Sequence, residues 1–490
     1  MFKSLLIANR GEIAVRIIRA AKELKIHTIA IYSPKDKNAL HVKLADEAFP
    51  LLEEGGNLGY LDMDQLMEIC TTKEVDCIHP GYGFLSESEE FARRIINAGI
   101  TFIGPSPSVI ELLGNKVKSR EMAEKVGLPV PPGSEIIRDI AEGQRAADVI
   151  GFPVIVKAVY GGGGMGIQIA ENSEKLEKAI KNASAQAEAA FGRGEVFIEK
   201  FIYEPRHIEF QLIADTHGNV VHLGERECSI QRRNQKLLEE APSIAITSEE
   251  RDKIGSLVCQ LAREVGYINA GTVEFLYQDG SVQFNEVNPR IQVEHPVTEM
   301  LTGKDLVKEQ IKVAAGEKLS FKQSDIDFRG HAIELRITAE DPLRNFQPTP
   351  GKIRKFNSPG GPQVRFDTAI YEGFEVPATY DSLLGKLIIG AETREAAINR
   401  ARNALKELVI LGFPTNIPFF EVLLHDEYFM KGKTNIHFIQ ERKLLESVRK
   451  NISLQAIALF AAGMKKNKIS LPTVSKQWKS QGRMEGVRRE

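Results

Sequence analysis

A run of four glycines between two apolar segments, in "VKAVYGGGGMGIQIA" (residues 156–170), constrains the local fold more than any other feature of the sequence. The pattern predicts a β-strand before the glycines and a second strand, "IQIAEN", after them. A P-loop or a dinucleotide-binding loop would lead into a helix, and no Lys-Ser or Lys-Thr pair follows these glycines. The sequence therefore predicts a hairpin flap.

Such a flap suits a phosphate ligand. Without Cβ atoms, backbone N–H groups can turn towards an anion and approach it closely. The alternative is a bare tight turn, but about two or three residues suffice for that, and ordering four consecutive glycines costs more conformational entropy. Lys157, on the strand before the glycines, supplies a cation nearby. We therefore favour a flap that closes over phosphates.

The first hundred residues alternate short apolar runs with helical patterns, as in "SLLIANRGEIAVRIIRAAKELKIHTIAIYS". This alternation predicts an open parallel sheet, which binds ligands beyond the carboxyl ends of its strands. The first turn lacks G-x-G-x-x-G, which argues against a dinucleotide-binding dehydrogenase. The proline-rich segment 127–136 indicates a crossing into a second unit, and from residue 331 short β-like runs with turn signals take over.

Composition excludes some classes of partner. The 490 residues carry 64 basic and 66 acidic side chains, so nothing global indicates a nucleic acid or a membrane. The first residues lack a signal-peptide pattern, and no apolar run is long enough to span a bilayer. The four cysteines form no C-x-x-C pair, which favours reduced thiols and a cytoplasmic protein. The stretch from about residue 450 begins as an apolar helix and ends basic around Trp478; its role is left unassigned.

A second constellation lies in "GTVEFLYQDGSVQFNEVNPRIQVEHPVTE". Two strand-like runs flank Asp-Gly, which predicts a β-hairpin. With an odd-length loop centred on Gly280, Glu274 faces Glu286, and facing carboxylates repel unless a cation lies between them. Asn288 falls on the same face. These oxygens suit Mg²⁺ or Mn²⁺; a solvated acidic edge is less favoured because apolar residues flank them.

The same alternation continues through Arg290, Gln292 and Glu294. If this segment is extended, these side chains form one row beside the metal ligands. Arg290 could then fork onto a small carboxylate-like anion, and Glu294 could take a proton from it. The charged segment "QRRNQK" (residues 231–236) is expected to contribute to the same site, whereas His207 is as compatible with a structural role as with a functional one.

At these residues the sequence resembles the ATP-grasp superfamily and, within it, biotin carboxylase, the carboxylating subunit of acetyl-CoA, propionyl-CoA or pyruvate carboxylases. The resemblance runs from residue 8 to residue 438, through "ANRGEIAVRIIRA", "HPGYGFLSE", "FIGPS", "GGGGMG", "QRRNQK", "EEAP", "NPRIQVEHPVTE", "ELRITAEDP", "YDSLLGKL" and "TNIHF". It implies an α/β and α+β chain of three domains, which a tail beyond the resemblance follows. These are a Rossmann-like N-terminal domain (residues 1–115), an ATP-grasp domain (116–330) with a mobile lid at about 132–202, a mixed β-rich C-terminal domain (331–446) and a helical, basic tail (447–490).

The resemblance also implies roles for individual residues. Those that would hold ATP are Lys116, Lys157, Gly163, Gly164, Gly166, Glu199, Lys200, Ile202, His207, Gln231, Asn234 and Glu274. Those that would hold Mg²⁺ (or Mn²⁺) are Glu274, Glu286 and Asn288. Those of the bicarbonate pocket are Lys236, Arg290, Gln292, Val293 and Glu294. Arg336 would face the biotin ureido oxygen, with Tyr82 at the mouth of the site.

The implied reaction is carboxylation of biotin N1′ through carboxyphosphate, with Glu294 as the base and Arg290, Lys236 and Arg336 as the other catalytic residues. The alternatives are another ATP-grasp carboxylate ligase or a non-catalytic nucleotide-binding subunit. Three residues depart from the family pattern: Asn234 replaces a frequent histidine, Met165 a frequent arginine or lysine, and Pro289 a frequent threonine.

The resemblance implies partner chains as well. A Met-Lys-Met-like biotinylation turn is absent from the sequence. We therefore expect biotin to arrive on a separate biotinyl carrier protein. A further expected partner is a carboxyltransferase subunit, and the expected assembly is a homodimer. The sequence leaves the final carboxyl acceptor open among pyruvate, acetyl-CoA, propionyl-CoA and others.

Overall fold

The structure is a computed structural model that describes residues 1–53, 58–161 and 164–465, with side chains up to residue 454. Its N-terminal part is a parallel sheet in the order β3-β2-β1-β4-β5, which confirms the predicted open parallel sheet. The strands are β1 (Ser4–Ile7), β2 (His27–Tyr32), β3 (Glu47–Pro50), β4 (Cys77–His79) and β5 (Thr101–Phe102). The helices around it are α1 (Gly11–Glu23), α2 (Leu40–Leu44), α3 (Met63–Thr72), α4 (Glu89–Asn97) and α5 (Pro107–Gly114).

The carboxyl ends of β1 and β4 lie side by side, with Ile7 paired to His79. Asn9, just after β1, donates from Nδ2 to the carbonyls of Pro80 (2.7 Å) and Tyr82 (2.8 Å). This amide ties the first βα turn to the turn after β4. The end of this sheet therefore presents the Tyr82 segment to the rest of the chain.

The central element is a large antiparallel sheet in the order β13-β12-β9-β10-β11-β14-β21-β19. Its strands are β9 (Arg206–Ala214), β10 (Val220–Arg232), β11 (Gln235–Ala241), β12 (Asn269–Gln278), β13 (Ser281–Asn288), β14 (His331–Thr338), β19 (Val364–Thr368) and β21 (Leu383–Ala391). β11 pairs with β14, so the sheet runs without a break across residue 331, where the sequence predicted a domain boundary.

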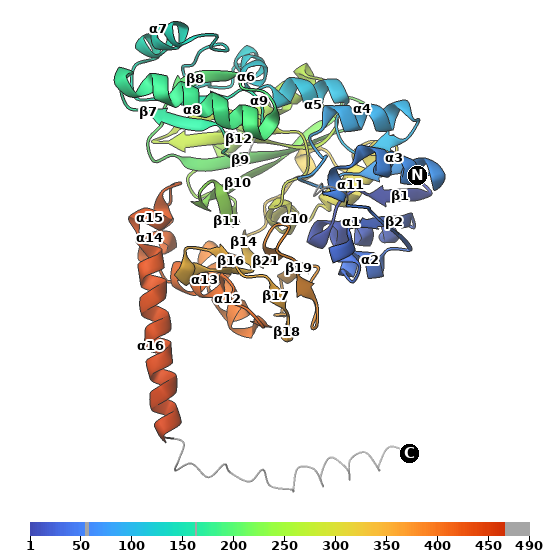
Figure 1. Cartoon of the computed structure of the whole chain (residues 1–490), viewed down its shortest axis with the longest axis vertical. Coiled ribbons are helices and arrows are strands. Elements are labelled where there is room, and N and C mark those ends of the chain that lie inside the picture. Colours follow the sequence, from blue (N-terminus) through green and yellow to red (C-terminus); the bar gives the residue numbers. More distant parts are fainter. Residues whose placement is uncertain (54–57, 162–163, 466–490) are drawn as a thin grey trace.

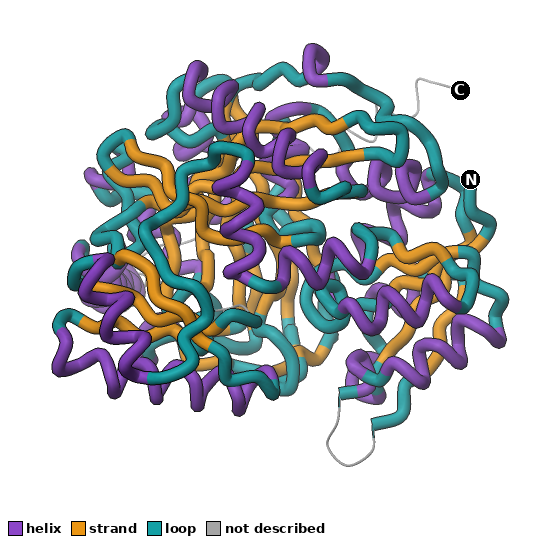
Figure 2. Tube along the Cα trace, turned by 90° about the horizontal axis from the view of Figure 1, so that it is seen from above, coloured by secondary structure: helices purple, strands orange, loops and turns teal. Residues whose placement is uncertain are grey.

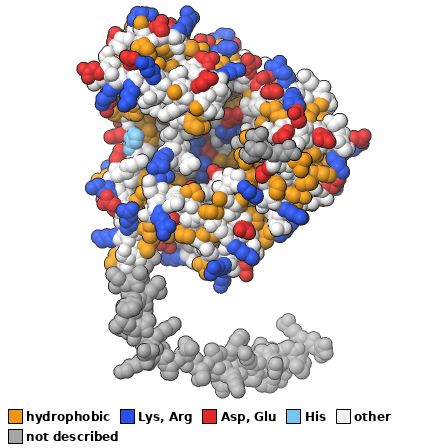
Figure 3. Space-filling view, in the orientation of Figure 1, with side chains coloured by type: hydrophobic (Ala, Val, Ile, Leu, Met, Phe, Trp, Pro, Cys, Tyr) orange, Lys and Arg blue, Asp and Glu red, His pale blue; other side chains and the backbone are white. Residues whose placement is uncertain are grey.

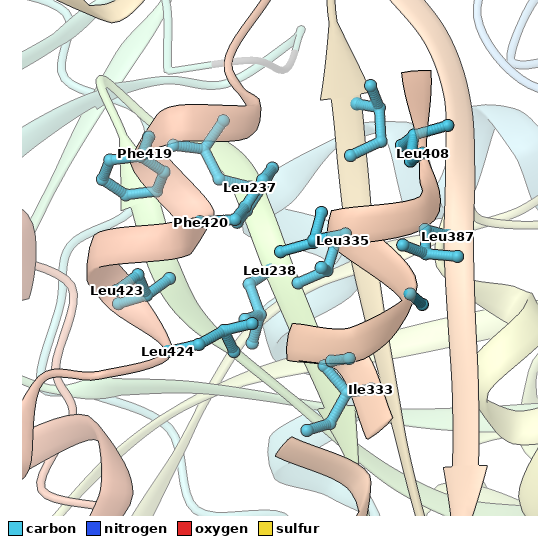
Figure 4. Packing of buried hydrophobic residues seen from close by; sticks show 14 of the residues in the cluster. Leu237, Leu238, Ile333, Leu335, Leu387, Leu408, Phe419, Phe420, Leu423 and Leu424 are labelled. Atoms are coloured by element: carbon cyan, nitrogen blue, oxygen red, sulfur yellow. The ribbon is translucent and has the colours of Figure 1, made fainter. Parts of the chain in front are cut away.

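The alternation of side chains along this sheet separates a core face from a polar face. Leu335 and Leu387 point into a hydrophobic cluster that α12 (Arg394–Glu407) and α13 (Ile417–Leu423) cover, as Figure 4 shows. Their sequence neighbours Arg336 and Lys386, which are paired across the strands, point to the opposite face. The core thus fixes which charged side chains face the cleft.

A separate three-stranded sheet, β7-β6-β8, lies at the top of Figure 1 in the segment predicted to be a lid, and this segment is called the lid below. It consists of β6 (Val154–Ala158), β7 (Ile167–Ala170) and β8 (Val196–Lys200), covered by α7 (Ile140–Ile150) and α8 (Ser173–Phe191). β6 and β7 pair in antiparallel fashion around the glycine run, which confirms the strand–loop–strand prediction. Gly162 and Gly163 lie outside the described residues.

The remaining elements connect or cover these sheets, and Figure 2 shows helices over the strands from above. The helices are α6 (Lys116–Lys125), α9 (Ser248–Glu264), α10 (His295–Thr302), α11 (Leu306–Ala314), α14 (Glu427–Met430), α15 (Phe438–Glu441) and α16 (Leu444–Lys465). The short strands are β15 (Glu340–Asp341), β16 (Gln347–Pro348), β17 (Gly351–Lys352), β18 (Lys355–Asn357), β20 (Glu375–Val376) and β22 (Val409–Leu411). Helix α16 extends away from the body (Figure 1), and the basic segment after residue 465 lies outside the described residues. Among the described helices, none combines the length and the apolar character that a membrane crossing requires.

Candidate active site

A cleft of about 1280 Å³ lies between the lid, the N-terminal sheet and the polar face of the central sheet. Figure 3 shows the molecule hollowed between the lid and the rest of the chain. The predicted site residues that line this cleft are Tyr82, Lys116, Lys157, Gly164, Glu199, Lys200, Ile202, His207, Gln231, Asn234, Lys236, Glu274, Glu286, Asn288, Arg290, Gln292, Val293, Glu294 and Arg336. The fold therefore gathers residues that are spread over some 250 positions of the sequence.

Glu274 and Glu286 are direct partners across β12 and β13, as the sequence predicted. The loop that was expected to place them is different, however. The strands meet in a two-residue turn, Asp279-Gly280, and a bulge at Asn285 then shifts the register by one residue. This bulge restores the pairing of the two glutamates, and Asn285 accepts a hydrogen bond from Lys157 Nζ of the lid (3.2 Å).

Cations of the chain hold these carboxylates. Lys236 Nζ lies 3.0 Å from Glu274 Oε1, 2.5 Å from Glu209 Oε2 and 2.6 Å from Glu294 Oε1. Lys116 Nζ lies 3.3 Å from Glu286 Oε2. Burial alone would lower the pKa of Lys236, but the three glutamates outweigh it and raise this pKa well above its usual value.

Burial has the opposite sign for a carboxyl group. It would raise the pKa of Glu274, but Lys236 and His207, whose Nε2 lies 3.1 Å from Glu274 Oε2, hold that pKa below its ordinary value. His207 therefore belongs to the cleft and contacts a predicted metal ligand.

The row from Glu286 to Glu294 is not extended along its whole length, so that prediction was wrong. β13 ends at Asn288, and the chain then turns so that Glu294 immediately precedes α10. Arg290 nevertheless stays beside the metal-ligand candidates. It donates to Asn288 Oδ1 (3.1 Å), Gln292 Oε1 (2.9 Å) and Glu87 Oε1 (2.5 Å).

Glu294 is fully buried and lies between two cations. One carboxylate oxygen meets Lys236, and the other accepts from Arg336 Nη2 at 2.9 Å. Burial raises the pKa of such a carboxyl group, but Lys236 and Arg336 outweigh burial and lower the pKa of Glu294 well below its usual value. Arg336 also contacts Glu239 at 2.5 Å, and burial is the main reason why the pKa of Glu239 rises to about 7.

The lid contributes its predicted residues in different ways. Lys157 Nζ lies 2.6 Å from Glu199 Oε2, and Lys116 Nζ donates to the Gly161 carbonyl at 2.6 Å. Lys200 lines the cleft but donates to the carbonyls of residues 151 and 152, at the base of the lid. In this conformation the backbone at Gly161 and Gly164 and the side chains of Lys116 and Lys157 line the cleft together.

The predicted lid glycines occupy different structural positions. Gly164 has a φ of +77°, which favours glycine, and a Cβ there would come within 2.0 Å of Asn234 Nδ2, so the glycine eases the close contact between the lid and the turn between β10 and β11. Gly166 does not line the cleft; it accepts a hydrogen bond from Ala158 and closes the β6–β7 hairpin. Gly163 lies outside the described residues.

In the "QRRNQK" segment, Gln231, Asn234, Gln235 and Lys236 line the cleft. Arg232 does not, because it donates to Asn345 at 2.7 and 2.9 Å. Tyr82 lies at the cleft and donates to Glu12. Val293 contributes its carbonyl to Lys386 Nζ at 2.8 Å, so its backbone rather than its side chain is engaged.

The sequence analysis missed several buried charged residues that hold the site. Glu209 bridges Lys236 and the fully buried Arg226, and Lys386 lies 3.1 Å from Glu12. For Glu209 a signal was present: His207, Glu209 and Gln211 alternate with apolar residues along β9. This period predicts a polar face on an otherwise buried strand.

Comparisons with known proteins agree with this architecture. Family models match at residues 1–110 (biotin carboxylase, N-terminal domain), 115–322 (carbamoyl-phosphate synthase L chain, ATP binding domain) and 334–441 (biotin carboxylase C-terminal domain). A pyruvate carboxylase subunit of Methanothermobacter thermautotrophicus is 50% identical over 442 residues, which are 90% of this chain and 90% of that protein. Biotin carboxylase of Haemophilus influenzae is 50% identical over 444 residues, which are 90% of this chain and 99% of that protein.

Solved structures give the same result. The biotin carboxylase domain dimer of Hydrogenobacter thermophilus 2-oxoglutarate carboxylase, in complex with MgADP, ADP and bicarbonate, superposes with a TM-score of 0.89. It is 49% identical and covers 91% of this chain and 98% of its own. A biotin carboxylase–nucleotide complex from Campylobacter jejuni has a TM-score of 0.88 at 42% identity, covering 90% and 99% of the two chains. The chain therefore belongs to the biotin carboxylase family.

Proposed function

We propose that this chain uses ATP and bicarbonate to carboxylate N1′ of a biotin that a separate carrier protein delivers. The observation that carries this proposal is the position of Glu294. It is buried between Lys236 and Arg336, beside the facing pair Glu274 and Glu286. The residues proposed as base, as anion-binding cations and as metal-binding carboxylates thus lie side by side in one cleft.

The carboxylate pair fits a divalent cation. Glu274 and Glu286 face each other from adjacent strands, and the Asn288 amide contacts Glu274 Oε1 at 3.0 Å. Lys236 and Lys116 now neutralise these oxygens. Hard oxygen ligands of this kind suit Mg²⁺ or Mn²⁺, which would be held by Glu274, Glu286 and Asn288 and would neutralise the negative charge of the phosphates.

ATP is proposed to lie beneath the lid. Lys116, Lys157 and the backbone around Gly164 would contact its phosphates. The segment Glu199–Ile202, at the base of the lid, would contact the adenine. This placement would put the terminal phosphate beside the carboxylate pair Glu274 and Glu286, and next to Arg290 and Glu294.

The proposed reaction proceeds through carboxyphosphate. Glu294 takes the proton of bicarbonate, and a bicarbonate oxygen attacks the γ-phosphorus, which releases ADP and forms carboxyphosphate. Cleavage of its C–O bond gives CO₂ and phosphate. The phosphate takes the N1′ proton of biotin, N1′ attacks CO₂, and Arg336 stabilises the negative ureido oxygen. Positioning by Arg290 and Lys236 supplies much of the rate.

The low pKa of Glu294 describes the cleft without substrates. Bicarbonate and the phosphates bring negative charge next to this carboxylate and share Lys236 with it. Both effects raise the pKa of Glu294 towards the range in which it can accept a proton. Substrate binding would therefore activate the base.

The test is ADP formation by the purified chain with Mg²⁺, with and without bicarbonate and free biotin. We expect cleavage that depends on bicarbonate and is stimulated by biotin, with carboxybiotin as a product. Cleavage that depends on a different carboxylate would support another ATP-grasp ligase. Binding of ATP without turnover would support a nucleotide-binding subunit.

We further propose that the partners are a biotinyl carrier protein and a carboxyltransferase subunit, that the assembly is a homodimer and that the location is the cytoplasm. Two relatives named above are subunits or domains of larger carboxylases, and one is a dimer in its structure. All four cysteines are buried and free, as in a reducing compartment. Co-purification and identification of bound chains tests the partners.

A further inference from the structure

Arg193 differs from every other cation of the cleft. The lysines and arginines that line the cleft are Arg10, Lys116, Lys157, Arg193, Lys200, Lys236, Arg290 and Arg336. Seven of these eight have an ion pair or a hydrogen bond to the chain. Within residues 1–53, 58–161 and 164–465, Arg193 shows neither, although a guanidinium offers five N–H donors. Its donors are therefore available to a ligand.

The fold holds Arg193 at the base of the lid. It lies in the turn between α8 and β8, which Ser184 Oγ fixes by donating to the Gly194 carbonyl at 2.7 Å. Its guanidinium carbon lies 4.5 Å from the centre of the Tyr160 ring, and the Tyr160 hydroxyl accepts from Asn115 Nδ2 at 2.9 Å. Stacking on an anchored ring orients the planar fork while leaving its edge free.

The same turn contacts the glycine run directly. A Cβ on Gly161 would come within 2.3 Å of the Phe191 ring, so the end of α8 packs closely on the first lid glycine. The lid itself brings no side-chain cation at its tip, where Met165 is 51% exposed. Lys116, the neighbouring cation, is held by Glu286 and the Gly161 carbonyl. Among the described cations that line the cleft, Arg193 is thus the one without an ion pair or hydrogen bond to the chain, and its turn packs on the first lid glycine.

We propose that Arg193, stacked on Tyr160, is a binding residue for the polyphosphate of the nucleotide and takes the place of a cation on the lid. This proposal rests on the proposed function, because it assigns a role in the same nucleotide site. An arginine fork forms charge-assisted hydrogen bonds with phosphate oxygens. Its partner is the polyphosphate and not the nucleoside, so it distinguishes ADP and ATP from adenosine.

The test measures binding of MgADP and of adenosine by calorimetry on the full chain, together with the KM for ATP. Arg193→Ala should raise the Kd of MgADP about fivefold to tenfold, as expected for one partly exposed charge-assisted contact. Adenosine binding should not change, and Arg193→Lys should recover part of the loss. Arg145→Ala is the matched control, since it removes an exposed arginine of lid helix α7 that does not line the cleft.

A compensating variant sharpens the test. If Arg193 substitutes for a lid cation, then Met165→Arg in the Arg193→Ala background should restore MgADP affinity. Unchanged MgADP affinity in Arg193→Ala would overturn the proposal, and so would an equal loss of adenosine binding, which indicates a structural effect. The two proposals are decided by different measurements. A wild-type chain without bicarbonate-dependent turnover would contradict the proposed function, whereas the Kd values for MgADP and adenosine decide the role of Arg193.

Discussion

The substitution Glu294→Gln isolates the base proposed for the reaction. It keeps the shape of a fully buried side chain but removes its charge and its capacity to accept a proton. The cations around it keep other partners, since Lys236 still meets Glu209 and Glu274, and Arg336 still meets Glu239. The fold should therefore survive, with a stability loss of about 2 kcal/mol for the charged contacts.

The catalytic loss should be larger. A positioned general base contributes roughly 10²–10⁴ in rate, which is about 3–6 kcal/mol at ~1.4 kcal/mol per tenfold. The assay is ADP release at saturating ATP, Mg²⁺ and bicarbonate with free biotin, and MgADP binding by calorimetry serves as the control. We expect kcat to fall by that factor, while the Kd of MgADP stays within about twofold because Glu294 is not among the proposed phosphate ligands.

An unchanged kcat in Glu294→Gln would refute the assignment of the base. A parallel loss of MgADP affinity would show that the residue holds the cleft together instead of acting on bicarbonate.

Glu286→Gln removes one carboxylate of the facing pair, so the Mg²⁺ concentration for half-maximal activity should rise on the order of tenfold; Asp279→Asn, at the hairpin turn, should leave it unchanged, and equal Mg²⁺ dependence in both would argue against the metal site. Arg290→Lys keeps the charge but loses the fork that contacts Asn288 and Gln292, so the KM for bicarbonate should rise about tenfold with little change in MgADP binding; an unaltered bicarbonate KM would contradict its role. Burial lowers the pKa of His41 from 6.5 to about 4, so the unfolded chain binds one more proton at this residue, and His41 alone should lower stability by up to about 1.4 kcal/mol per pH unit as the pH drops from 6.5 towards 4. Urea unfolding of the wild type and of His41→Gln at pH 7, 6 and 5 checks this, and the variant should lose less stability on acidification by that amount; the same loss in both proteins would contradict it.

The pairing of Glu274 with Glu286 was predictable from the sequence, although the reason given for it was incomplete. The alternation of apolar residues around Asp-Gly predicts the hairpin, and an odd loop brings the two glutamates together. The structure reaches the same pairing by a two-residue turn and a bulge at Asn285. A bulge depends on how the strand packs against the neighbouring strands of the sheet. The alternation of apolar and polar residues within one segment gives no information about that packing.

The sequence after Arg290 carries a signal against an extended row up to Glu294. Pro296 occupies the first turn of α10. A proline at this position favours a helix start. Glu294 consequently lies at a strand-to-helix turn, a place where it meets Lys236 and Arg336 from two different strands.

Long-range pairs were beyond prediction from patterns alone. Glu12 and Lys386 meet although they are separated by most of the sequence, and no periodicity links them. The domain boundary at residue 331 stays a prediction. Because β11 pairs with β14, a domain boundary at residue 331 would cut through a continuous sheet. The order of the strands in that sheet depends on the whole fold, so a local sequence pattern does not reveal it.

The proposed reaction depends above all on one step, the attack of a bicarbonate oxygen on the γ-phosphate of ATP in this cleft. Bicarbonate labelled with ¹⁸O at all its oxygens tests this step, with the released phosphate analysed by mass spectrometry during biotin carboxylation. We predict one ¹⁸O atom in each phosphate, because the attacking oxygen remains on phosphorus when the C–O bond breaks. Phosphate without label would mean that water cleaves ATP, and would contradict the proposed reaction.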